Sequence, residues 1–352
     1  MPHIAIAGEQ QSLDAGARTV LDAAVAADVM FPYGCRAGRC GTCKVRLLSG
    51  SVRMDEYSFD ALSADERADG LILGCKAHPV TDIELAHLHA TDVAGRCVIR
   101  RMNGTIERIE TLTRDIVGLH VSVSGCPFSF LPGQYVQMYC GGLPPRLYTM
   151  ASPPEQPMLE FHVRRIPRGR VSTYIAGLLR EGDSISLCGP FGSGYRRPAS
   201  PARPLLMVAF DEGLAPMLAI LRALLSEGRT DPVFLYQSIF GTRDPYFSDD
   251  LNRLMERNAW LRYVPIVDVQ STPLIRRVMR MEHILTADFG SLRGFQAQIA
   301  GPSALVTSLR STIARLGVPS QDVHMVPFYL TRPDRMYGVR SAPASGTKRL
   351  NF

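Results

Sequence analysis

The sequence has no apolar run of the roughly 18–20 residues that a membrane-spanning helix requires. Its first residues also lack the basic segment and apolar core of a secretory signal peptide, so we expect a cytoplasmic protein without a membrane partner. Lysine and arginine are dispersed and form no basic stripe, which argues against nucleic acid as a partner despite a net charge of +6. The sequence contains no internal repeat.

Length and charge distribution indicate several domains. At 352 residues the chain is too long for one ordinary core, and its 46% hydrophobic and 20% charged residues are typical of a globular protein. Residues 1–92 contain 8 Lys and Arg against 13 Asp and Glu, a net charge of −5, whereas residues 93–196 contain 12 against 7, a net charge of +5. An acidic segment beside a basic one predicts separate domains, the basic one suited to phosphate binding and electrostatic docking.

The pattern of apolar residues and turns predicts domains at 1–92, 93–200 and 201–332, followed by a tail at 333–352. The second block has short alternating strands between regular turns, which predicts an antiparallel barrel. The third alternates apolar runs suited to buried strands with helical patterns, which predicts a parallel sheet covered by helices. The tail is rich in Pro, Ala, Ser and Gly without periodicity, and we expect it to be flexible. The predicted fold class is multidomain, combining α+β and α/β parts.

Four of the eight cysteines form one spacing pattern. Cys35, Cys40 and Cys43 follow C-x4-C-x2-C and Cys75 lies further along the chain, which is the spacing of plant-type 2Fe–2S ferredoxins. Two irons bridged by two sulfides need four thiolates, and a tight loop can supply three of them. Zinc or free thiols are the alternatives, but zinc sites usually have two paired knuckles and only one C-x2-C pair is present. The remaining cysteines are predicted to be small buried hydrophobic residues: Cys97, Cys126, Cys140 and Cys188.

The residues around these cysteines resemble the ferredoxin domain of oxygenase reductases. The likeness lies in residues 31–35 (Phe-Pro-Tyr-Gly-Cys) and 38–45 (Gly-Arg-Cys-Gly-Thr-Cys-Lys-Val). It implies a β-grasp fold for about residues 1–92. Glycines in this loop would let its backbone pass close to the cluster and aim N–H groups at the sulfides.

The second block contains two motifs that resemble the flavin fingerprint of the ferredoxin–NADP reductase superfamily. They are Arg146-Leu147-Tyr148-Thr149, which fits R-x-Y-[ST], and Gly169-Arg170-Val171-Ser172, which fits G-x-x-[ST]. Arg146 can neutralise the pyrophosphate of FAD, Tyr148 can pack its ring against the isoalloxazine, and Thr149 can offer a hydroxyl near its redox-active edge. The second motif would open a helix whose first N–H groups face the same pyrophosphate. An ordinary barrel strand is the alternative for each motif taken alone.

The same resemblance implies further cofactor contacts. His162, Val163 and Arg164 would line the adenine side of the flavin. Phe328, an aromatic residue near the end of the third block, is predicted to be catalytic together with Tyr148 and Thr149. Further predicted cofactor contacts are Gly189, Pro190, Gly213, Gly301 and Pro302.

The third block departs from the family pattern at three places. The family has Gly-Gly-[ST]-Gly after the first strand, where this chain has Phe210, Asp211 and Glu212 before the last glycine. Two carboxylates at an anion-binding turn would repel a pyrophosphate by about 1–4 kcal/mol per close pair. Residues 237–239 (Gln-Ser-Ile) lack the family's arginine, and Ala300 replaces its cysteine. We therefore predict that NAD(P)H binding is weakened, remodelled or lost.

The resemblance covers residues 1–332 and is clearest, at residues 158–164 and 170–174, to the ferredoxin reductases of naphthalene dioxygenase-type Rieske oxygenase systems. It implies a reductase component that moves electrons from NAD(P)H through FAD and a 2Fe–2S cluster to a terminal oxygenase or its ferredoxin. A di-iron monooxygenase is the alternative oxygenase, because those reductases share this domain order. The departures leave a second hypothesis, a flavin and iron–sulfur relay or partner-binding subunit with weakened or lost NAD(P)H reactivity.

Overall fold

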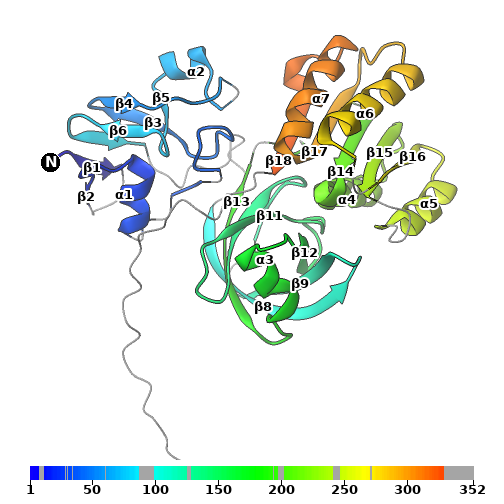
Figure 1. Ribbon diagram of the computed structural model, residues 1–352, viewed down its shortest axis with the longest axis horizontal. Coiled ribbons are helices and arrows are strands. Elements are labelled where there is room, and N and C mark those ends of the chain that lie inside the picture. The colour runs from blue at the N-terminus through cyan, green and yellow to red at the C-terminus, as the bar shows by residue number, and fades with distance from the viewer. Residues whose placement is uncertain are drawn as a thin grey trace, which may run out of the picture.

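A computed structural model describes residues 1–7, 12–27, 29, 31–33, 35–59, 61–86, 99–124, 128–192, 194–196, 202–240, 246–269 and 272–328. Figure 1 shows three bodies: an N-terminal body in blue, a barrel in cyan and green, and a parallel-sheet body running from green to red. The domain boundaries predicted near residues 92, 200 and 332, and the predicted tail, lie outside the described residues. Within those residues, no helix is long and apolar enough to cross a membrane.

The N-terminal body is a mixed five-stranded sheet of order β2-β1-β7-β3-β5, with β4 and β6 paired separately. Its helix α1 begins where the Thr19 side chain accepts a hydrogen bond from the Asp22 N–H, and it packs its apolar face into the core of this body. The predicted β-grasp fold is confirmed. Its elements are β1 (His3–Ile6), β2 (Leu13–Asp14), α1 (Val20–Ala26), β3 (Lys44–Ser49), β4 (Val52–Met54), α2 (Ala64–Ala68), β5 (Leu71–Leu73), β6 (Ala77–Pro79) and β7 (Ile83–Leu85).

The barrel is a six-stranded antiparallel sheet of order β11-β10-β13-β8-β9-β12. A bridge between Met150, next to β11, and Phe161 of β12 joins its two edge strands. This confirms the predicted antiparallel barrel. Its elements are β8 (Arg100–Thr111), β9 (Ile116–Ser124), β10 (Tyr135–Tyr139), β11 (Arg146–Thr149), β12 (Met158–Arg164), α3 (Arg170–Gly177) and β13 (Ser184–Phe191).

The third body is a parallel five-stranded sheet of order β16-β15-β14-β17-β18, as predicted. Its strands and helices are β14 (Leu205–Phe210), α4 (Leu214–Ser226), β15 (Val233–Phe240), α5 (Ser248–Arg257), β16 (Leu261–Asp268), α6 (Leu274–Asp288), β17 (Gln296–Pro302), α7 (Ser303–Arg315) and β18 (Val323–Phe328). Two short 3-10 turns, η1 (Asp211–Gly213) and η2 (Ser320–Asp322), precede α4 and β18.

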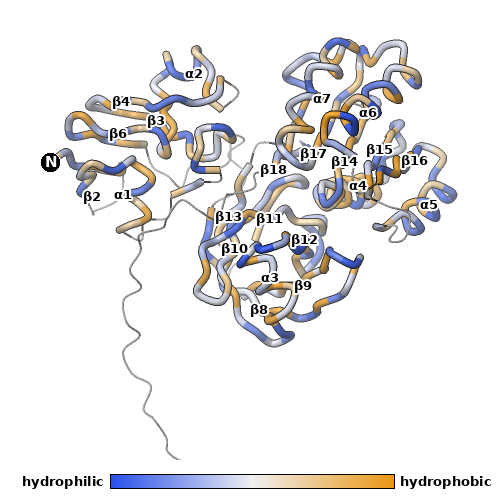
Figure 2. Tube along the Cα trace, in the orientation of Figure 1, coloured by the Kyte–Doolittle hydropathy of each residue, from blue (hydrophilic) through white to orange (hydrophobic). Residues whose placement is uncertain are grey.

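Strand β14 is the centre of this body. All six of its side chains are buried, and the hydropathy colouring in Figure 2 marks it and α4 as apolar. Helices α4 and α5 contribute to one core cluster and α6 and α7 to another, so both faces of the sheet are covered. The chain runs outward from β14 through β15 to β16, then returns to the other side for β17 and β18. The carboxyl end of β14 is therefore the topological switch point, where open parallel sheets bind ligands.

Candidate functional site

Three of the four motif cysteines lie in the loop before β3, and Cys75 follows β5. The register of β3 against β5 places Lys44 opposite Leu73, and this brings Cys43 next to Cys75. The thiols form two hydrogen-bonded pairs, Cys35 with Cys40 and Cys43 with Cys75.

Backbone N–H groups of the loop point at these sulfurs. Those of Ala37 and Arg39 lie 3.4 Å and 3.3 Å from the Cys35 Sγ, and the Cys35 N–H lies 3.4 Å from the Cys40 Sγ. The loop depends on Gly38 and Gly41, with φ of +67° and +71°. A Cβ on Gly41 would lie 2.9 Å from the Ala61 carbonyl oxygen. The sequence thus folds a loop whose amides can stabilise negative charge on sulfur.

Within each pair, one thiol has a lowered pKa and the other a raised pKa. The hydrogen bond with Cys40, helped by backbone N–H groups, lowers the pKa of Cys35 to about 5, and the same bond together with burial raises the pKa of Cys40. The bond between Cys43 and Cys75 raises the pKa of Cys43 and lowers that of Cys75.

Two pairs of thiols suit two irons, since each iron of a 2Fe–2S cluster takes two thiolates besides the bridging sulfides. The residues present therefore fit the cluster predicted from the sequence. Of the other cysteines, Cys140 and Cys188 are buried as predicted, and Cys97 and Cys126 lie outside the described residues.

The first flavin motif forms β11. Its register with β10 sets Tyr148 opposite Val136 and Thr149 opposite Tyr135. Arg146, Leu147 and Tyr148 are half-buried and Thr149 is buried. The Arg146 Nη1 donates to the Pro145 carbonyl at 2.9 Å, and no carboxylate among the described residues pairs with it. Arg146 is thus available to bind an anion.

The second flavin motif begins helix α3, as predicted. Gly169 is the N-cap, no side chain caps the helix, and α3 contacts β12. The Ser172 Oγ accepts from the Ile166 N–H at 3.1 Å and donates to the Gly169 carbonyl at 3.4 Å, which holds the turn. The first N–H groups of α3, contributed by Arg170 and Val171 among others, therefore have no side-chain partner and fit a phosphate.

Two predicted contacts lie within β13. Gly189 and Pro190 are buried, and a Cβ on Gly189 would lie 2.8 Å from the Val136 Cγ1. Gly189 therefore has a packing role between β13 and β10. A cofactor contact by either residue stays a prediction.

The structure gives His162 a role that the sequence analysis did not foresee. Its Nε2 lies 2.7 Å from Glu160 Oε1 and its Nδ1 lies 2.5 Å from the Tyr246 hydroxyl, while Glu160 accepts from Arg222 of α4 at 2.5 Å. Burial lowers the pKa of His162. Burial alone would raise the pKa of Glu160, but the hydrogen bond from His162 and the charge of Arg222 hold it at about 2. This buried network joins the barrel to the parallel-sheet body.

Both ring nitrogens of His162 are therefore occupied by protein groups, and Val163 is fully buried in the barrel core. Contact of this segment with adenine stays a prediction.

The acidic turn at the switch point is neutralised by a buried arginine of α6. Arg277 donates from Nη1 and Nη2 to both carboxylate oxygens of Asp211, at 2.8 Å and 2.9 Å, and from Nε to Asp268 at 3.2 Å. Its Nη2 also donates to the Ser238 hydroxyl at 2.7 Å. Arg277, Asp211 and Asp268 are each no more than 3% exposed. The carboxyl ends of β14, β15 and β16 are thus tied together by one internal ion network.

Arg164 neutralises the second carboxylate. Its Nε lies 3.1 Å from Glu212 Oε2 and 3.5 Å from Asp115 Oδ2, and its Nη1 lies 3.7 Å from Asp211 Oδ2. The contact with Glu212 is an ion pair without hydrogen-bond geometry, and burial raises the pKa of Glu212 in spite of it.

One expectation changes as a result. Asp211 and Glu212 do not present unpaired charges to a ligand, so the predicted repulsion of pyrophosphate rests on a wrong premise. Arg164 pairs with the turn η1 of the parallel-sheet body, and its contact with the adenine side of the flavin stays a prediction.

The other predicted residues of the third body meet at the same edge of the sheet. A Cβ on Gly213 would lie 2.3 Å from the Ala300 carbonyl oxygen, and one on Gly301 would lie 2.7 Å from the Phe210 Cβ. Pro302 is opposite Phe328 in the pairing of β17 with β18. The two glycines therefore allow η1 to touch β17, and half-buried Phe328 ends the neighbouring strand.

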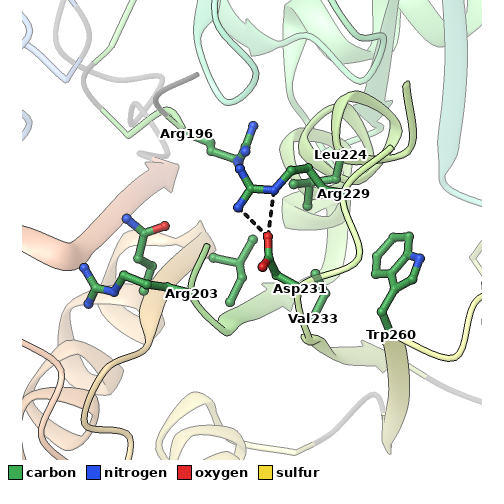
Figure 3. A pocket seen from close by; sticks show the side chains of 9 residues that line it. Arg196, Arg203, Leu224, Arg229, Asp231, Val233 and Trp260 are labelled. Atoms are coloured by element: carbon green, nitrogen blue, oxygen red, sulfur yellow. Dashed lines mark hydrogen bonds and ion pairs between the residues drawn. The ribbon is translucent and has the colours of Figure 1, made fainter. Parts of the chain in front are cut away.

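A small cavity lies at the opposite end of the sheet, where β14 and β15 begin (Figure 3). Arg229 pairs there with Asp231, and Arg196, Arg203 and Trp260 also line it. Its volume of about 10 Å³ leaves room for roughly one water. It is not placed at the carboxyl edge, where a coenzyme would bind.

Comparisons with known proteins agree with this geometry. Residues 4–80 match the 2Fe-2S iron-sulfur cluster binding domain, and residues 103–195 match the oxidoreductase FAD-binding domain. The chain is 32% identical over 303 residues to the ferredoxin–NAD(P)+ reductase component of the naphthalene 1,2-dioxygenase system of Pseudomonas putida, covering 86% of this chain and 90% of that protein. It is 30% identical to the reductase subunit of an Amycolatopsis aromatic O-demethylase, covering 92% and 98% of the two chains.

A crystal structure of an Amycolatopsis cytochrome P450 reductase superposes with a TM-score of 0.69 at 29% identity, covering 94% of this chain and 99% of that one. At this identity and coverage the chain belongs to the same family, the NAD(P)-dependent reductases that join a 2Fe–2S ferredoxin domain to an FAD-binding oxidoreductase domain.

Proposed function

We propose that this protein moves electrons from NADH or NADPH through FAD to its 2Fe–2S cluster and on to an oxygenase or that oxygenase's ferredoxin. One observation carries the proposal. The loop with the paired cysteines contacts β10, and β10 is hydrogen-bonded along its length to β11, which bears the flavin motif. The loop with the cysteine motif and the strand with the flavin motif are therefore both neighbours of β10, which supports transfer of electrons between the two proposed sites.

The chemistry of each residue indicates which cofactor it would bind. Arg146 and the first N–H groups of α3 would hold the pyrophosphate of FAD, while Tyr148 and Thr149 would face its ring. Cys35, Cys40, Cys43 and Cys75 would hold the cluster; Phe328 and the turn at Gly301 would lie near the nicotinamide. Bound FAD supplies the exchange between two-electron and one-electron chemistry, and the protein supplies position and electrostatics.

The oxygenase partner is proposed to be of the Rieske type, with a di-iron monooxygenase as the alternative. The names of the relatives support the wider class only, because they include a dioxygenase and an O-demethylase system. A cytoplasmic location suits the proposal, since reducing conditions keep the four ligand cysteines free of disulfides.

Replacing Arg146 with alanine should weaken FAD retention. A charge-assisted hydrogen bond to phosphate is worth roughly 1.5–3 kcal/mol, so the dissociation constant of FAD should rise about 10- to 150-fold. Fluorescence titration of the flavin-free protein measures this change. Arg114→Ala is the matched control, because Arg114 is exposed in the turn between β8 and β9. Equal FAD affinities of the two variants would show that Arg146 does not contribute to FAD binding.

A second candidate function is an electron relay that NAD(P)H does not reduce. The observation that favours it is the sequence of the switch-point turn, where Phe210, Asp211 and Glu212 stand in place of the two glycines and the hydroxyl residue of the family pattern.

Steady-state oxidation of NADH and NADPH, with ferricyanide as electron acceptor, separates the two functions. The reductase should show saturable turnover with at least one nucleotide. Turnover with neither, in protein that retains FAD and two irons per chain, would contradict the reductase and favour the relay.

A further inference from the structure

Strand β10 presents a polar face to the N-terminal body. Val136 and Met138 point into the barrel core and are fully buried. Because side chains alternate along a strand, Tyr135, Gln137 and Tyr139 share the opposite face.

Two side chains of this face bind the loop that carries the cysteines. The Tyr135 hydroxyl lies 2.6 Å from the Thr42 hydroxyl, and the Gln137 Nε2 donates to the Tyr33 carbonyl at 3.0 Å. Thr42 stands between two of the ligand cysteines, and its hydroxyl also bonds the thiol of Cys40. A continuous hydrogen-bonded chain therefore leads from β10 to a cluster ligand.

The position of Tyr135 is fixed from the flavin side as well. In the pairing of β10 with β11 it is opposite Thr149, the residue proposed to face the redox-active edge of the flavin. The centroid of its ring lies 6.1 Å from that of the Phe191 ring. A Cβ on Gly192 would lie 2.7 Å from the Tyr135 ring. Tyr135 is thus held between the cysteine loop and the strand that bears the flavin motif.

We propose that Tyr135 is a positioning residue that holds the cluster loop against the flavin-binding strand and so sets the rate of electron transfer from flavin to cluster. Gln137 supports the same contact from the next outward position of β10. The inference rests on the proposed function for the direction of electron flow. One electron leaves the flavin and one enters the cluster, and the Tyr135 and Thr42 hydroxyls neither gain nor lose a proton.

The decisive variant is Tyr135→Phe, which removes the hydroxyl and keeps the ring against Phe191 and Gly192. The matched control is Tyr236→Phe. Tyr236 is a buried tyrosine of β15 that loses a comparable hydrogen bond, of 2.6 Å to Asp288, in the other body. Each holoprotein is tested by hydrogen exchange of residues 35–43 and by the rate of cluster reduction after flash photoreduction of the flavin.

Loss of the hydroxyl should speed exchange of the Ala37 and Arg39 amides and slow cluster reduction, each by about two- to twelvefold, the range that one net hydrogen bond allows. Tyr236→Phe should change neither. The rhombic signal of the reduced cluster should persist in both variants, which shows that the ligands are intact. Exchange and electron-transfer rates of Tyr135→Phe equal to those of wild type would overturn the proposal.

Photoreduction supplies the electron without a nucleotide, so this test stands even if NAD(P)H proves unable to reduce the flavin. In that case the proposed function would fail while the role of Tyr135 could still be confirmed. Faster exchange of the loop amides with no change in the electron-transfer rate would limit the role of Tyr135 to stabilising the loop. That result would also overturn the proposal.

Discussion

Replacing Cys75 with serine should remove the iron–sulfur cluster. Iron content should fall from about two per chain towards zero, since one iron would keep a single thiolate. The visible absorbance of the cluster and the paramagnetic resonance signal of its reduced state should disappear with the iron. FAD should remain bound, because its proposed contacts lie in the barrel. Iron analysis and electron paramagnetic resonance measure these changes.

Cys140→Ala is the matched control, because Cys140 is equally buried but belongs to the core of the barrel. It should retain both irons. Equal loss of iron from both variants would show instability of the fold and would contradict the assignment of Cys75 as a ligand.

Replacing Arg277 with methionine should destabilise the parallel-sheet body by about 3–5 kcal/mol. Asp211 and Asp268 would stay buried without the cation that they share, and removing one partner of a buried ion pair carries a penalty of that size. The melting temperature of the variant should fall by roughly 10 °C. Thermal unfolding followed by circular dichroism measures it.

Arg280→Met is the control on the same helix. Arg280 is half exposed and reaches Asp268 only at 3.5 Å, so its removal should cost less than about 1 kcal/mol. Adding Asp211→Asn and Asp268→Asn to Arg277→Met should restore part of the stability, because the stranded charges are then removed. Equal stability of the Arg277 and Arg280 variants would show that the network does not support this body.

The cysteine site was predictable because most of its information is local. Cys35, Cys40 and Cys43 stand within nine residues, and their spacing alone indicates the cluster. The pairing of Cys43 with Cys75 depends instead on the register between β3 and β5, which the sequence does not display. The three-part architecture was predictable for the same reason, because strand and helix periodicities change visibly along the chain.

The charged residues at the switch point could not be interpreted from the sequence. The sequence predicts that Asp211 repels phosphate, because its partner Arg277 is 66 residues away, on a helix with two other arginines. Glu160 and Arg222 are similarly 62 residues apart. A motif identifies residue types, but the pairing of buried charges is decided by tertiary packing.

The most direct test of the account is anaerobic stopped-flow mixing of the oxidised holoprotein with NADH and, separately, NADPH. Flavin and cluster absorbance are followed at their own wavelengths in a single turnover. We predict that the flavin is bleached first, at a rate that saturates with nucleotide concentration, and that the cluster is reduced afterwards. A cluster reduced before the flavin, or a flavin that neither nucleotide reduces while dithionite still does, would contradict the account.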